Sequence, residues 1–150
     1  KKVIMAFQIG PDFYNYAYKT ILNFYEQLFS EKDLKTFRDL KVWQKSHQLV
    51  LEIYKASENF PKEEKFGLIS QIRRSASSVP TNIVEGFKRI SKKEFAHFLN
   101  MADSSLEETK YHLILSADLG YLKESESKRL EELCDEVGKM LYGLQNKLTT

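Results

Sequence analysis

The apolar positions of this chain recur at steps of three and four residues, the spacing that places side chains on one face of an α-helix. One such stripe begins after Asp39, a candidate N-cap, and consists of Leu40, Trp43, His47, Val50 and Tyr54. Another follows residue 94 and consists of Phe95, Leu99, Ala102, Leu106, Thr109, Leu113 and Ala117. A last helix is predicted from about residue 123, with an inward face made of Leu130, Leu133, Val137, Met140, Leu144 and Leu148.

A fourth stripe crosses a proline and consists of Ile69, Ile72, Ala76, Val79, Ile83, Gly86 and Ile90. Its steps keep phase on both sides of Pro80, which favours one helix bent at the proline, because two helices joined by a loop rarely stay in register. Pro80 cannot donate to the carbonyl of Ala76, a loss of about 3 kcal/mol in an undisturbed helix, but nearby serine hydroxyls can bond to a freed carbonyl. A break at Ser78-Val79 is the alternative, since residues before proline avoid the helical region.

The segment "ISKKEF", residues 90–95, is typical of a helix start. Ser91 is the predicted N-cap, and Glu94, three residues later, would complete a capping box. Ile90 and Phe95 have the spacing of a hydrophobic staple. Beyond the end of this helix, Gly120 can adopt the left-handed conformation that commonly terminates helices.

Short connections between four amphipathic helices force neighbours to run antiparallel. Residues 37–150 are therefore predicted to form an all-α, up-down-up-down antiparallel four-helix bundle. Residues 1–36 are an N-terminal extension expected to hold an additional aromatic helix, with a face made of Phe13, Ala17, Ile21, Phe24 and Leu28. Such a face should pack on the bundle or on another chain. Met5 is a candidate initiator, and the sequence leaves open whether Lys1–Ile4 are native.

The composition is that of a soluble helical protein. The 150 residues include only 6 glycines and 3 prolines, too few turn formers for a sheet protein with many hairpins. No apolar run is long enough to cross a bilayer, so no membrane partner is expected. Cys134 is the only cysteine, which excludes an intramolecular disulfide and predicts a buried thiol in a reducing, cytoplasmic compartment.

The net charge of +2 hides an uneven distribution. Residues 62–93 carry 8 basic and 3 acidic side chains, a net +5, whereas residues 94–150 carry 6 basic and 11 acidic ones, a net −5. The middle of the chain is therefore the part that can attract nucleic acid.

Six cations in that stretch are candidates for binding phosphate: Arg73, Arg74, Lys88, Arg89, Lys92 and Lys93. One alternative is local pairing, because Glu85 and Arg89 have the i, i+4 spacing of a helix ion pair. A second alternative is that Arg73 and Arg74 face a neighbouring protomer instead of a ligand.

The sequence offers no catalytic or metal-binding pattern. His47, His97 and His112 lack the spacing of metal ligands, and Ser91 is accounted for as a cap. A glycine-rich phosphate loop and a GxSxG segment are both missing from the sequence. We therefore expect a protein that is not an enzyme and that needs neither a metal nor another cofactor.

From residue 37 onward, four blocks resemble a known bacterial family. They are "FRDLKVWQKSHQLVLEIYK", "FPKEEKFGLISQIRRSASSVPTNIVEGFKR", "SKKEFAHFL" and "ADLGYL". Over about residues 37–147 the chain is similar to the 23S rRNA intervening-sequence proteins, also called the four-helix-bundle or S23 family. The recognisable positions are Asp39, Trp43, Arg73, Arg74, Pro80, Asn82, Glu85, Gly86 and Phe87.

The resemblance implies a four-helix bundle that assembles into a ring-shaped homopentamer and has no catalytic residues. It also implies a connection to rRNA, because members are often encoded inside insertions in the large-subunit rRNA gene. A distant relative with this fold is the accessory protein of diversity-generating retroelements, a basic pentamer that binds nucleic acid and a reverse transcriptase. The two functions expected are therefore RNA binding through a basic surface and, alternatively, a protein–protein adaptor or scaffold.

The residues expected to shape the bundle or its assembly are Pro80, Asn82, Glu85, Gly86, Trp43 and Phe87. Asn82 and Glu85 are expected to satisfy backbone groups loosened by the proline, or to bond an arginine across a subunit contact. Trp43 and Phe87 are expected in the core, in preference to a role as stacking platforms for bases.

Overall fold

Four long helices follow one another along the chain. The computed structural model describes residues 34–149, and its elements are η3 (Phe37–Asp39), α2 (Lys41–Ser57), η4 (Lys62–Phe66), α3 (Leu68–Phe87), α4 (Lys92–Asp118) and α5 (Glu124–Thr149). This described part contains helices and connecting turns, without a strand. Of the N-terminal extension, residues 1–36, only the last three are described, so the predicted aromatic helix lies outside the described residues.

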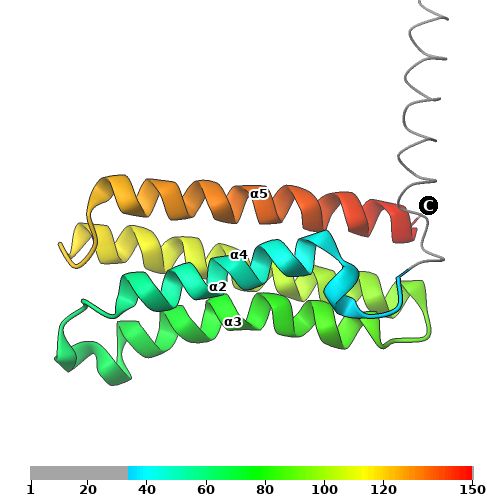
Figure 1. Cartoon of the computed structure of the whole chain (residues 1–150), viewed down its shortest axis with the longest axis horizontal. Helices are drawn as coiled ribbons and strands as arrows, with labels where there is room; N and C mark the ends of the chain where they lie inside the picture. Colours follow the sequence, from blue (N-terminus) through cyan, green and yellow to red (C-terminus); the bar gives the residue numbers. More distant parts are fainter. Residues whose placement is uncertain (1–33, 150) are drawn as a thin grey trace, which may run out of the picture. The chain divides into compact units, whose positions relative to one another are not determined.

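Each helix packs beside the one that precedes it, and α5 closes the bundle against α2 (Figure 1). The chain runs along the bundle in alternating directions, so α2 lies diagonally opposite α4. The short connections leave the chain no room to cross the bundle, and this enforces the antiparallel order. The predicted all-α, up-down-up-down four-helix bundle is confirmed.

The core is a layer of aliphatic side chains from all four helices. Those with essentially no exposed surface are Leu49, Ile53, Ile72, Val79, Ile83, Leu99, Leu106, Leu113, Leu130, Val137 and Leu141. Burial of each such side chain contributes about 1.5–3 kcal/mol relative to exposure. On α4, the predicted stripe from Leu99 to Leu113 is confirmed, because each of its positions is buried.

α3 continues through Pro80 as one helix, as predicted. The proline is buried, and the side chains that follow it bond to carbonyls one turn earlier. Thr81 Oγ1 donates to the carbonyl of Ser77 over 2.8 Å, and Asn82 Nδ2 donates to the carbonyl of Ser78 over 2.9 Å. These bonds reinforce the turn where the missing N–H of proline weakens the backbone ladder.

Gly86 brings α3 and α4 together near the connection between them. A Cβ atom at this position would lie 2.7 Å from both Cδ2 of Phe95 and Cβ of Phe98. Real Cβ atoms do not approach other atoms that closely, so the contact depends on glycine. Further along the same interface, the buried hydroxyl of Thr109 donates to Ser75 Oγ over 3.0 Å and joins the two helices by a polar bond.

α2 presents a different face to the core from the one predicted. Its buried residues are Val42, Ser46, Leu49, Ile53 and Ser57. The predicted stripe contains one buried residue, Leu40, and four half-buried or exposed ones, Trp43, His47, Val50 and Tyr54. The predicted stripe is displaced by one residue from the buried one. Both stripes have helical spacing, and the predicted stripe has the larger side chains. Ser46 and Ser57 can be buried because each hydroxyl bonds to a carbonyl of its own helix.

α5 differs from its predicted stripe in a similar way. It buries Ser127, Leu130, Cys134, Val137 and Leu141. Leu130 and Val137 are as predicted, whereas Leu133 and Met140 are only half-buried and lie beside the core stripe. Because α5 packs against both α4 and α2, side chains on either side of its core stripe are partly covered, and the sequence does not distinguish them.

The start and end of α4 are largely as predicted. Ser91 is the N-cap, and its Oγ accepts from the amide of Glu94 over 3.1 Å. The predicted capping box is only half formed, because the Glu94 carboxylate accepts from the Ser91 hydroxyl over 3.0 Å and not from the Ser91 amide. Gly120 follows the helix with φ of 75°, the left-handed conformation predicted for it. The predicted hydrophobic staple is wrong, because Ile90 is fully exposed and does not pack on Phe95.

Asp39 is not the N-cap of α2. The cap position is Leu40, which makes no side-chain bond to the helix. The Asp39 carboxylate instead accepts from the amide of Thr36 over 2.9 Å, and this bond closes a capping box around η3. The prediction failed because an additional turn of 3₁₀-helix precedes α2 and uses the aspartate.

Replacing Gly86 by alanine is expected to lower the free energy of unfolding by about 1–3 kcal/mol, the usual effect of overpacking an interface. Gly143→Ala is the matched control, because a Cβ atom on that helical glycine of α5 meets nothing within 4 Å. The control should raise stability by about 0.5–1 kcal/mol, through helix propensity alone. Denaturant unfolding followed by circular dichroism measures both values, and equal effects of the two substitutions would contradict the close approach.

Candidate nucleic-acid interface

The connection between α3 and α4 carries four cations within six residues. α3 ends at Phe87, and α4 begins at Lys92 after its N-cap. The basic corner is defined here as Lys88, Arg89, Lys92 and Lys93. All four side chains are exposed, and Ile90 between them has a relative exposure of 103%. The short turn therefore points a compact group of positive charges into solvent.

The charges of the basic corner are not neutralised within residues 34–149, where none of the four side chains forms an ion pair. The pairing of Glu85 with Arg89, weighed as an alternative from their spacing, does not occur in this part of the chain. The guanidinium carbon of Arg89 lies instead 4.7 Å from the ring centre of Phe98. A cation over an aromatic ring is held in place while its N–H groups remain available to an anion.

Two members of the basic corner are placed where they oppose helix stability. Lys92 and Lys93 occupy the first turn of α4, where the aligned peptide dipoles already produce a positive potential. Stability alone favours acidic residues at this place, and Glu94 is the acidic residue of the first turn. A helix start with this charge attracts anions.

The opposite situation holds around α5, where charges are paired between helices. Lys45 Nζ lies 3.1 Å from Glu136 Oε1, and Arg129 Nη2 lies 2.8 Å from Glu52 Oε2, so both pairs link α2 to α5. Lys110 of α4 lies 2.8 Å from Asp135 of α5. The hydrogen bond to Asp135 raises the pKa of Lys110, and the one to Glu126 raises that of Arg129. The carboxylates of Glu52, Asp135 and Glu136 therefore already have cationic partners from the same chain.

Arg73 is tied to α2. Its Nε donates to Ser57 Oγ over 2.8 Å, and its guanidinium carbon lies 4.6 Å from the ring centre of Tyr54. The neighbouring Arg74 is exposed and forms no ion pair in residues 34–149. Both arginines lie about four helical turns, roughly 20 Å, from the basic corner. The structure therefore separates the six predicted cations into two groups.

Of the other predicted positions, Trp43 lies on α2, and the remaining five lie between these two groups on α3. The Asn82 amide bonds to the carbonyl of Ser78, Glu85 is exposed, and both Pro80 and Gly86 are buried. Phe87 is half-buried, and its ring meets that of Phe95 edge-on at 6.4 Å between ring centres. Gly86 and Phe87 pack against α4 and so position the end of α3, from which the basic corner follows.

The sequence analysis missed a group of aromatic residues at the start of α2. The ring of Trp43 is stacked on that of His47, with 5.2 Å between ring centres and planes only 6° apart. The edge of Phe37 meets Trp43 at 5.0 Å with an interplanar angle of 66°. Phe37, Trp43 and His47 are called the aromatic stack below. Assigning the α2 stripe to the core concealed this group, whereas the alternation of aromatic residues and cations in "FRDLKVW" is the signal that indicates it.

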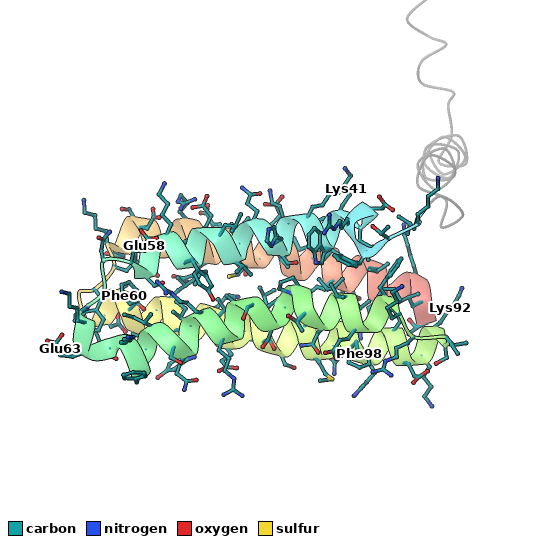
Figure 2. The ribbon with its side chains drawn as sticks, turned by 60° about the horizontal axis from the view of Figure 1, so that its bottom comes forward. Lys41, Glu58, Phe60, Glu63, Lys92 and Phe98 are labelled. Atoms are coloured by element: carbon teal, nitrogen blue, oxygen red, sulfur yellow. The ribbon has the colours of Figure 1, made fainter. Side chains whose placement is uncertain are left out.

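The aromatic stack lies toward the same end of the bundle as the basic corner. Figure 2 shows Lys41, at the start of α2, and Lys92, at the start of α4, toward one end, with Glu58 and Phe60 at the other. This placement follows from the antiparallel order, because α2 begins beside the end of α3. The short helix η3, which carries Phe37, contacts both α2 and α3.

The described residues bring together no group of His, Cys, Asp or Glu that could hold a metal ion. Cys134 is completely buried, and burial raises the pKa of its thiol to about 12, so it is protonated at neutral pH. None of the helices described has both the length and the apolar character needed to cross a membrane. The chemistry that this surface supports best is the binding of an anionic polymer by exposed cations.

Comparison with known proteins agrees with the resemblance noted in the sequence. The family described as 23S rRNA-intervening sequence protein matches residues 38–143. The chain is also similar to a crystal structure from Bacteroides thetaiotaomicron, described as a protein of unknown function from the S23 ribosomal protein family. The two are 28% identical with a TM-score of 0.61, and the similarity covers 68% of this chain and 95% of that one. No curated protein matches the chain.

Replacing Arg73 by alanine is expected to lower the free energy of unfolding by about 1–2 kcal/mol, because it removes a charged hydrogen bond and a cation–π contact between α2 and α3. Arg74→Ala, which removes the same charge from the next position, should change stability by less than about 0.5 kcal/mol. Urea unfolding of the two variants makes the comparison directly. If the two arginines contribute equally, Arg73 does not tie α2 to α3.

Proposed function

The chain belongs to the 23S rRNA-intervening sequence protein family, and from this premise we propose that it is a non-enzymatic, homo-oligomeric bundle that binds RNA through the basic corner. The observation that carries the proposal is the basic corner itself, four exposed cations without an ion pair in residues 34–149. Two of them lie at a helix start, where they oppose stability. Residues that work against the fold are expected where function requires them.

RNA is the partner whose chemistry fits this arrangement. The Arg89 guanidinium can bind a phosphate with two parallel N–H bonds, while the three lysines act as point charges around it. Each phosphate that is neutralised releases counterions, and this release supplies most of the affinity for a nucleic-acid backbone. One basic corner binds weakly and with strong dependence on salt.

Self-assembly makes such a weak site effective. A homopentamer, which the family resemblance implies, repeats the basic corner on every protomer, so that one RNA can contact several corners at once. The protomer has exposed apolar side chains that a neighbouring copy can cover, among them Leu51, Phe66, Met101, Ile114, Leu119 and Tyr142. A cytoplasmic location is consistent with this role.

The adaptor alternative stays a prediction. Its support is the aromatic segment from Phe13 to Phe29, which lies outside the described residues. A partner such as a reverse transcriptase would bind there, on a part of the chain remote in sequence from the basic corner.

Replacing all four residues of the basic corner by alanine is expected to weaken binding of a structured rRNA fragment and to reduce the slope of log K against log salt by roughly 3. Fluorescence anisotropy at several salt concentrations measures both quantities. The matched control is Lys62→Ala/Lys65→Ala/Lys123→Ala/Lys128→Ala, which removes the same charge from the other end of the bundle. Equal losses in the two variants would mean that net charge, and not this surface, accounts for the binding.

In solution, the full chain is expected to have the mass of five protomers, measured by light scattering during size-exclusion chromatography. The same measurement on a chain without residues 1–34 separates the bundle's own contacts from those of the N-terminal extension. A full-length protein that remains monomeric at micromolar concentration would refute the homo-oligomeric part of the proposal.

A further inference from the structure

We propose that the aromatic stack is a second part of the RNA site and that the exposed ring of His47 stacks against an unpaired base. This inference rests on the proposed function, and it names the class of RNA that the site selects. The ligand is RNA with single-stranded nucleotides, at a loop, a bulge or an end, next to a phosphate backbone that the basic corner contacts.

The geometry of the aromatic stack prepares a flat surface. Trp43 is half-buried and is held by the edge of Phe37, while one side of its ring system is stacked on the imidazole of His47. His47 is exposed, so it is the outermost member of a nearly parallel pair of rings. A base that stacks on the outer side of the His47 ring would form a third layer on the stacked rings of Trp43 and His47. Because both rings are already ordered in the free protein, binding costs little side-chain entropy.

The surrounding charge favours a nucleotide over an apolar partner. Arg38 and Lys41 are exposed on η3 and α2 and form no ion pair in the described part of the chain. Residues 38–41 and 85–94, which include the basic corner, carry six cations against three carboxylates. Two of those carboxylates, Asp39 and Glu94, are engaged by capping groups. The surplus of positive charge is complementary to a polyanion.

The distances along the helices are compatible with one RNA segment reaching both parts. His47 lies six residues, about 9 Å, inside the start of α2, whose beginning is beside the end of α3. A base paired in a duplex offers its faces to its neighbours in the stack, so an aromatic side chain cannot reach them without unstacking. Unpaired nucleotides leave a face free, and stacking of a single base on an aromatic side chain changes affinity by about tenfold or more.

The experiment uses Trp43 as its own reporter, because it is the only tryptophan in the chain. The full chain is titrated with an RNA hairpin whose loop contains unpaired adenosines, and with the same hairpin carrying abasic nucleotides in the loop. The two RNAs have the same phosphates and the same duplex, so they differ only in the bases available for stacking. Fluorescence anisotropy gives the affinity, and Trp43 emission reports a base at the aromatic stack.

The wild-type protein is expected to bind the intact loop about tenfold more tightly than the abasic one, with quenching of Trp43 by the intact loop alone. His47→Leu, which keeps Trp43 covered but removes the flat ring, should bind both RNAs equally. His47→Phe should restore the preference for the intact loop. Tyr111→Ala, which removes an exposed aromatic side chain from α4, should behave as wild type.

Three results would overturn the inference in distinguishable ways. Equal binding of both hairpins by wild type, with loss of binding when the basic corner is removed, would refute the aromatic contact and leave the proposed function in place. Failure of both hairpins to bind would refute the proposed function and this inference with it. A third result is that Trp43 emission does not change on addition of RNA and that His47→Leu dissociates the oligomer. This result would mean that the His47 ring packs between copies of the chain.

Discussion

The close approach of α3 and α4 at Gly86 is the constraint on which the rest of the bundle depends. Phe98 takes part in it twice, because its Cβ atom faces Gly86 and its ring supports the guanidinium of Arg89. The backbone amide of Arg89 also bonds to the carbonyl of Gly86 over 3.0 Å. The packing of an apolar interface therefore determines where a charged surface residue stands.

Some polar groups of the bundle have partners within the described part of the chain, whereas others do not, and this difference distinguishes residues that stabilise the fold from residues available for binding. Buried hydroxyls, such as Ser75 and Thr109, find partners across or within helices. On α5, Glu136 pairs with a lysine of α2 and Asp135 with a lysine of α4. At the other extreme, the basic corner has no such partners in residues 34–149. A stable bundle does not need these four charges, and the first turn of α4 would be more stable without two of them.

The sequence predicted those features that depend on neighbouring residues. Ser91, Gly120 and the uninterrupted helix through Pro80 follow from local backbone chemistry, and the structure confirms them. The face of α2 could not be predicted in the same way, because Trp43 and Leu49 lie on adjacent stripes with identical spacing. Only packing against α3 and α5 decides which stripe is buried, and this information is not local.

The same distinction applies to the candidate site. The cations of the basic corner are close in sequence, so charge counting along the chain was enough to find them. The bond from Arg73 to Ser57 joins residues 16 positions apart, and it separates that arginine from the group with which it was counted. The aromatic stack could be associated with the basic corner only after the topology had placed the start of α2 beside the end of α3.

The order of the helices also has a consequence for how the chain folds. Three of the four helix–helix interfaces join elements that are consecutive in sequence, so most of the core is built from helical hairpins with short loops to close. Such local topologies fold rapidly, and each hairpin can form as soon as its second helix has left the ribosome. The interface of α2 with α5 spans the largest sequence separation and is linked by Lys45–Glu136 and Glu52–Arg129. This interface between α2 and α5 therefore completes the bundle, once α5 has emerged.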